Sequence, residues 1–140
     1  MQNTINDNGA KSICLIIWSA IFCSAFVYPP FLDNGYPLPS SEHSLQIDWV
    51  VLLSLLMIGI ATVVRWLVIP KVGMSPVVFP LLIIGLAFTE ATIFFEIFLL
   101  GPSQPNEKAL IYWLAIASML QFFPLYIRKR EAPPAIKQFD

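Results

Sequence analysis

Four long apolar stretches occupy most of this 140-residue chain. A helix needs about 20 predominantly apolar residues to cross the ~30 Å hydrocarbon core of a bilayer, and each stretch reaches or approaches that length. Prolines, a glycine or a run of basic residues end each stretch, as expected where helices stop. We therefore predict an all-α integral membrane bundle of four transmembrane helices, at residues 12–28, 48–69, 77–100 and 109–127.

The composition agrees with a chain that is surrounded by lipid. Hydrophobic residues make up 57% of the chain, charged residues 12%, and the mean hydropathy is +0.73. A soluble domain carries about twice that share of charge. Residues 1–140 therefore form a single membrane domain, in which a soluble catalytic domain has no room, and residues 128–140 are predicted to be a flexible cytoplasmic tail.

Several classes of partner and cofactor are excluded by the residue types present. A net charge of −1 gives no electrostatic footprint for nucleic acid. The single histidine, His43, and the two cysteines, Cys14 and Cys23, are too few for a typical zinc site. The cysteines are predicted to pack on opposite faces of one helix. We predict no metal and no cofactor; the predicted partners are the lipid bilayer and either a second copy or another membrane protein.

The basic residues predict the orientation. Lys108 is alone on one side of the predicted membrane, and seven basic residues share the other side. By the positive-inside rule both termini are cytoplasmic. An alternative is that the first apolar stretch is a signal peptide cleaved after Ala25, which would leave three spans. The seven residues are Lys11, Arg65, Lys71, Arg128, Lys129, Arg130 and Lys137.

One carboxyl, that of Glu90, falls close to the middle of the third predicted helix. A charge is most costly there, and this side chain is too short to reach the headgroups, so we expect a protonated carboxyl that donates a hydrogen bond. Candidate acceptors lie at matching depth on the other helices. They are Ser19, Ser24, Ser54, Thr62, Ser118 and Gln121.

Two further ionisable residues lie inside the predicted spans. Glu96 lies about 120° around the helix from Glu90 and near its outer end, where it is expected to reach water or to meet Lys108. Arg65 is near the inner end of its span, so its long side chain is expected to extend to the cytoplasmic headgroups. The candidate ion-binding residues are therefore Glu90, Glu96, Ser118 and Gln121, with no catalytic residue.

Small residues at four-residue spacing mark the third helix as central. Gly85 with Thr89, and Ala87 with Ala91, form the small-xxx-small pattern that allows helices to approach closely. Glu90 lies between these two stripes and is expected to face a neighbouring helix.

The segment GLAFTEATIFFEIFLL, residues 85–100, resembles the second helix of the proteolipid c subunit of rotary ATP synthases. In that family a lone carboxylate in an apolar helix binds a proton or sodium ion, and the resemblance assigns that position to Glu90. The chain as a whole resembles a group of small four-helix bacterial membrane proteins, which implies location and topology but no reaction.

Three functions are compatible with these residues. The first is a polytopic membrane protein without enzymatic activity, a helix-packing subunit or scaffold in which Glu90 is a buried hydrogen-bonding residue. The second is proton or sodium handling through Glu90, within an oligomer. The third, a membrane enzyme or lipid-binding factor, is disfavoured because no cluster of nucleophile, base or metal ligands is present.

Overall fold

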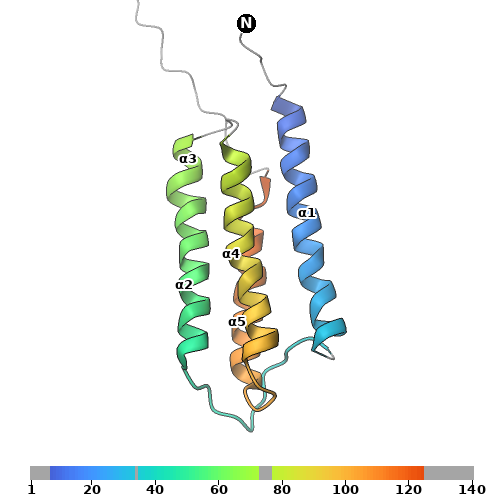
Figure 1. Ribbon diagram of the computed structural model, residues 1–140, viewed down its shortest axis with the longest axis vertical. Coiled ribbons are helices and arrows are strands. Elements are labelled where there is room, and N and C mark those ends of the chain that lie inside the picture. Colours follow the sequence, from blue (N-terminus) through green and yellow to red (C-terminus); the bar gives the residue numbers. More distant parts are fainter. Residues whose placement is uncertain (1–6, 34, 73–76, 125–140) are drawn as a thin grey trace, which may run out of the picture.

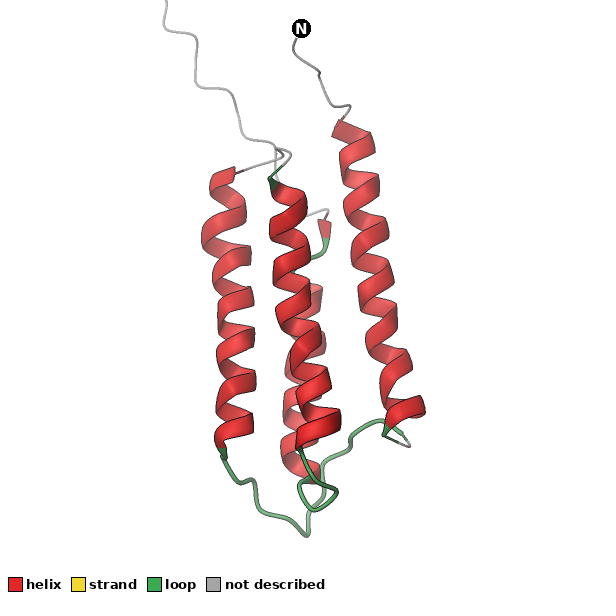
Figure 2. Cartoon of the chain, viewed as in Figure 1, coloured by secondary structure: helices red, strands yellow, loops and turns green. Residues whose placement is uncertain are grey.

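Four antiparallel helical rods make up the computed structural model, which describes residues 7–33, 35–72 and 77–124 (Figure 1). The first rod is α1 (Asp7–Leu32). The second is continuous through α2 (Trp49–Val63), the π-helical turn η1 (Val64–Val68) and α3 (Ile69–Val72). The third is α4 (Val78–Leu99) and the fourth is α5 (Pro105–Leu120). Within the described residues there is no strand, so the predicted all-α class is confirmed (Figure 2).

Three of the four rods are long and apolar enough to span a membrane. They are Lys11–Leu32, Trp49–Val72 and Val78–Leu99, with 22, 24 and 22 residues. The prediction of four spans is therefore wrong in its count for the part of the chain described here. The exception is α5, whose 16 residues extend about 24 Å, less than the ~30 Å hydrocarbon core.

The fourth helix has different ends from those predicted at residues 109 and 127. It begins earlier, with Pro105 in its first turn, where a missing amide hydrogen leaves no intrahelical bond unmade. It ends earlier because the chain turns after Leu120, where the amides of Phe122 and Phe123 bond carbonyls only three residues back. Pro124 thus lies beyond the end of the helix and does not kink it.

The first helix continues past Pro29 and Pro30, where the sequence predicted its end. These prolines lack the amides that would bond the carbonyls of Ala25 and Phe26. Two tyrosine hydroxyls replace them. Tyr112 donates to the Ala25 carbonyl at 3.4 Å, and Tyr36 donates to the Phe26 carbonyl at 3.0 Å. The helix therefore reaches Leu32 because distant residues satisfy the carbonyls that its prolines leave free.

The second rod also continues through a proline. The sequence predicted a stop at Pro70, yet α3 extends to Val72. Before it, η1 widens the helix, and the amide of Ile69 bonds the carbonyl of Val64, five residues back. A π-turn of this kind changes the register of the backbone just where a proline ring would crowd the carbonyl four residues earlier.

The central helix is α4, as predicted. It contacts α1, the α2–α3 rod and α5, whereas α1 and α2 do not touch. Figure 1 shows α4 in front of α5, with α1 and α2 on either side. Gly85 permits the close approach to the chain after α5, because a Cβ there would lie 2.3 Å from the Phe122 ring. Of the two small-residue stripes, Gly85 and Thr89 are buried, whereas Ala87 is exposed.

Candidate functional site: the carboxyls of the central helix

Glu90 joins the central helix to α1. It is half-buried near the middle of α4, and its Oε1 is 3.0 Å from Ser24 Oγ and 2.9 Å from Tyr28 Oη, both on α1. Ser24 and Tyr28 lie one helical turn apart on the same face of α1. The prediction that Glu90 faces a neighbouring helix is confirmed, and the structure shows that this helix is α1 of the same chain, with Ser24 among the candidate partners.

A count of hydrogens bears on the state of this carboxyl. Three contacts need one hydrogen each, namely Ser24 with the Ile21 carbonyl at 2.6 Å, Ser24 with Glu90, and Tyr28 with Glu90. The two hydroxyls supply only two hydrogens, and the carbonyl supplies none. With a proton on the Glu90 carboxyl, each of the three contacts has a hydrogen of its own.

Ser118 and Gln121 do not join Glu90. They belong to a second polar cluster, between α2, α4 and α5, in which the Gln121 side-chain amide donates to Ser118 at 2.8 Å and to Thr62 at 3.2 Å. Ser118 Oγ also lies 3.4 Å from Thr89 Oγ1 on α4. Thr89 adjoins Glu90 in sequence but points about 100° away around the helix, so the predicted ion-binding residues divide between two faces of α4.

Arg65 corrects another expectation. It does not extend to the surface, since it is only 5% exposed. Its Nε donates to the backbone carbonyl of Gln121, which ends α5, and its guanidinium carbon lies 5.2 Å from the centre of the Trp66 ring. A cation at the carboxyl end of a helix satisfies a free carbonyl and complements the helix dipole.

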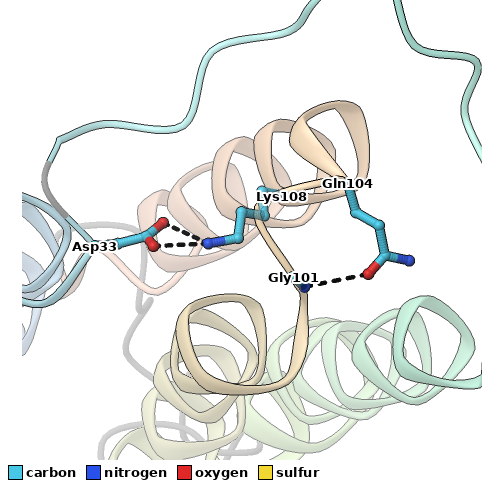
Figure 3. Close-up of polar contacts among 4 residues, drawn as sticks. All are labelled: Asp33, Gly101, Gln104 and Lys108. Carbon is cyan, nitrogen blue, oxygen red and sulfur yellow. Dashed lines mark hydrogen bonds and ion pairs between the residues drawn. The ribbon is translucent and has the colours of Figure 1, made fainter.

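Glu96 differs in every respect from Glu90. Its side chain is fully buried, and within the described residues neither carboxyl oxygen has a hydrogen-bond partner. The expectation that Glu96 reaches water is therefore wrong. Nor does it bond Lys108, because Lys108 Nζ lies 2.7 Å from both carboxyl oxygens of Asp33. Figure 3 shows the Lys108 side chain pointing away from α5 toward Asp33 at the end of α1.

The outer ends of the helices are tied together by polar contacts around this ion pair. Gln104, which precedes α5, accepts from the Gly101 amide at 3.2 Å (Figure 3). Its side-chain amide also donates to Asp48 at 3.0 Å. Asp48 caps α2 by accepting from the amides of Val50 and Val51. The amide of Val51 and the side chain of Gln104 lower the pKa of the Asp48 carboxyl below its ordinary value of 3.8.

Three residues of this site were missed or misplaced by sequence reasoning. The hydroxyls of Tyr28 and Tyr112 were not among the predicted partners, yet they contact Glu90 and the Ala25 carbonyl inside the bundle. Asp33 was not among the candidate residues either. Asp33 follows the first predicted span and Lys108 precedes the fourth, on the same side of the predicted membrane. These positions are compatible with an ion pair but do not by themselves predict it.

A metal centre has no counterpart in the described ranges, where no three His, Cys, Asp or Glu side chains gather to hold an ion. The two cysteines are both free; Cys14 is buried and Cys23 is exposed, as expected for opposite faces. Comparison with protein-family models, with curated proteins and with solved structures finds no match for this chain.

Proposed function

We propose that this protein is a polytopic membrane protein without enzymatic activity, and that its bundle serves as a helix-packing subunit or scaffold. The observation that supports this proposal is the pair of contacts from Ser24 and Tyr28 to Glu90. These contacts hold α1 to α4 through Glu90. The α4 helix is the main neighbour of α1 in the fold. A hydrogen bond between helices is the expected role for a polar group at that depth.

The proposal extends to topology. α5 packs against α4 and α2, so it forms a fourth membrane-embedded segment although it is too short to span alone. We propose that both termini lie on the cytoplasmic side of a bacterial cytoplasmic membrane; the distribution of the basic residues supports this orientation. The partner would be a second copy or another membrane protein, docked on the apolar outer faces that the helices present to lipid.

Proton or sodium handling through Glu90 is the second candidate. One observation favours it: with a proton on the Glu90 carboxyl, each of the three contacts around Ser24 and Tyr28 has a hydrogen of its own. A group that holds a proton in a structured site at mid-depth is able to exchange it if the site opens. The resemblance of residues 85–100 to the proteolipid helix assigns the same role to Glu90.

Ion flux in liposomes that contain the purified protein separates the two functions. Wild type and Glu90→Gln are compared for proton and sodium uptake under an imposed gradient, because glutamine keeps an acceptor for Ser24 and Tyr28 but binds no proton. The scaffold function predicts no flux above empty liposomes for either protein. If wild type shows flux and a normally inserted Glu90→Gln protein does not, the scaffold function is contradicted and ion handling through Glu90 is supported.

Labelling with a hydrophobic carbodiimide gives an independent readout of the same question. The reagent modifies protonated carboxyls in apolar surroundings. For the scaffold, Glu90 held by two hydroxyls is expected to stay unmodified across a pH series mapped by mass spectrometry. Modification of Glu90 that fades as the pH rises would show an accessible, titrating carboxyl and support ion handling.

A further inference from the structure

The Glu96 carboxyl is a buried acid for which the fold provides no hydrogen-bond partner among the described residues. Two charged side chains nevertheless lie near the Glu96 carboxyl. Lys108 and Asp33 are near enough to act on it electrostatically, and Glu96 in turn acts on Tyr112, one turn after Lys108 on α5. Buried acids without partners are rare in native proteins, and each calls for an explanation.

The charges around Glu96 cancel. Lys108 makes two 2.7 Å contacts with Asp33, so the pair contributes no net positive charge. An ionised Glu96 beside a neutral ion pair, with no hydrogen bond and no water contact, is highly unfavourable. The arrangement seen is therefore that of a protonated Glu96 and an intact Lys108–Asp33 pair.

We propose that Glu96 is a proton-binding site at the outer end of the bundle, and that loss of its proton moves Lys108 from Asp33 to Glu96. The step is balanced: the Glu96 proton leaves to water, the Glu96 carboxylate takes the Lys108 ammonium as its partner, and Asp33 keeps its negative charge. An unpaired carboxylate costs less at Asp33 than at Glu96, because the Asp33 side chain is 24% exposed at the end of α1 whereas Glu96 is fully buried.

The groups that face Glu96 determine how it titrates. Asp33 contributes a negative charge from the end of α1, Lys108 a positive charge from α5, and Tyr112 a hydroxyl from the next turn of α5. Tyr36, in the loop after α1, lies against Tyr112 with ring centres 6.2 Å apart. The α2 helix, residues 49–63, contains no ionisable side chain; its hydroxyls are those of Ser54, which is buried, and of Thr62, which accepts from Gln121.

The consequence concerns α1. Its main contacts are with α4, and its outer end is tied to α5 by the Lys108–Asp33 pair. When Lys108 turns to Glu96, that tie is lost, while the Glu90 contacts farther down α1 remain. Proton release at Glu96 would thus free the outer end of α1 and leave the rest of the bundle assembled.

The test is infrared spectroscopy of the full-length protein in lipid nanodiscs over a pH series, following the carbonyl stretch of protonated carboxyls. Wild type is expected to show a band that is lost as the pH rises. Glu96→Gln should lack this titrating band, and the matched control Glu90→Gln should keep it. A band absent at all pH values, constant at all pH values, or lost in Glu90→Gln and retained in Glu96→Gln would overturn the proposal.

A second variant does not depend on replacing Glu96. Asp33→Asn removes the competitor for Lys108 but keeps a hydrogen-bond acceptor at that position. Since Lys108 is then free to stabilise the Glu96 carboxylate, the band should disappear at a pH lower by about one unit or more. An unchanged midpoint in Asp33→Asn would show that Lys108 is not shared between the two acids.

Discussion

Glu90 and Glu96 lie six residues apart on the same helix, yet the fold treats them in opposite ways. Glu90 is half-buried and has two hydroxyl partners on α1. Glu96 is fully buried and has none among the residues described, although it lies close to the Lys108–Asp33 ion pair. The Glu90 carboxyl therefore links two helices. The Glu96 carboxyl has no hydrogen-bond partner, and the nearby Lys108 ammonium is already paired with Asp33.

The difference shows that depth in the membrane does not by itself decide the role of a carboxyl. By depth alone Glu90 is the costlier residue, since it lies near the middle of α4, and Glu96 is the easier one to reach from water. The side chains on neighbouring helices reverse this order. Ser24 and Tyr28 contact the deeper carboxyl, that of Glu90. Glu96, nearer the helix end, is fully buried and is therefore shielded from water.

The largest effect is expected from breaking the ion pair beside Glu96. Lys108→Met leaves Asp33 without its partner, and we expect it to reduce the free energy of unfolding by about 2–4 kcal/mol, toward the lower end for buried pairs because Asp33 is 24% exposed. The measurement is unfolding in mixed detergent micelles. Lys108→Arg, which keeps the charge, is the control. A change below about 0.5 kcal/mol, typical of surface pairs, would contradict the structure.

Replacing the two carboxyls with methionine should shift stability in opposite directions. Glu90→Met removes two hydrogen bonds between helices and is expected to destabilise by about 1–2 kcal/mol. Glu96→Met removes a buried acid that has no partner, and at neutral pH is expected to be neutral or stabilising by about 1–2 kcal/mol. Thermal unfolding of both variants in the same micelles checks this. Equal losses of stability in the two variants would contradict the distinction between the Glu90 and Glu96 sites.

The smallest effect concerns the cap of α2, at the first turn of the second rod. The folded pKa of Asp48 is lowered by the Val51 amide and Gln104, so its contribution is present above the unfolded pKa and is lost as the pH falls through the folded pKa. We expect the protection of the Val50 and Val51 amide hydrogens against exchange, relative to their intrinsic rates, to fall as the pH drops through the lowered pKa of Asp48. Asp48→Asn should remove this pH dependence, and an unchanged acid response would contradict the assignment.

The sequence predicted the helices more accurately than their ends. Apolar length locates all four rods, and the third, predicted at residues 77–100, is found at Val78–Leu99. Prolines misled the prediction in α1 and at Pro70. A proline ends a helix unless something else satisfies the carbonyl that it leaves free, and in α1 the donors are Tyr112 and Tyr36, which no local pattern reveals.

The partners of the site were less predictable than its carboxyls. Glu90 stands out in a sequence because a carboxyl is rare within an apolar helix. Its partner Ser24 was one of six candidates of similar depth, since depth does not tell which faces of two helices meet. Tyr28 was not among those candidates, and only the packing of α1 on α4 turns its hydroxyl toward Glu90.

A double-mutant cycle between Tyr28 and Glu90 tests most directly whether this carboxyl holds α1 to α4. Unfolding free energies of wild type, Tyr28→Phe, Glu90→Met and the double variant are measured in lipid-containing micelles. We predict that the two residues are coupled by about 0.5–1.5 kcal/mol, as expected for one hydrogen bond between helices in a membrane. Strict additivity of the two substitutions, with no coupling beyond error, would contradict the account.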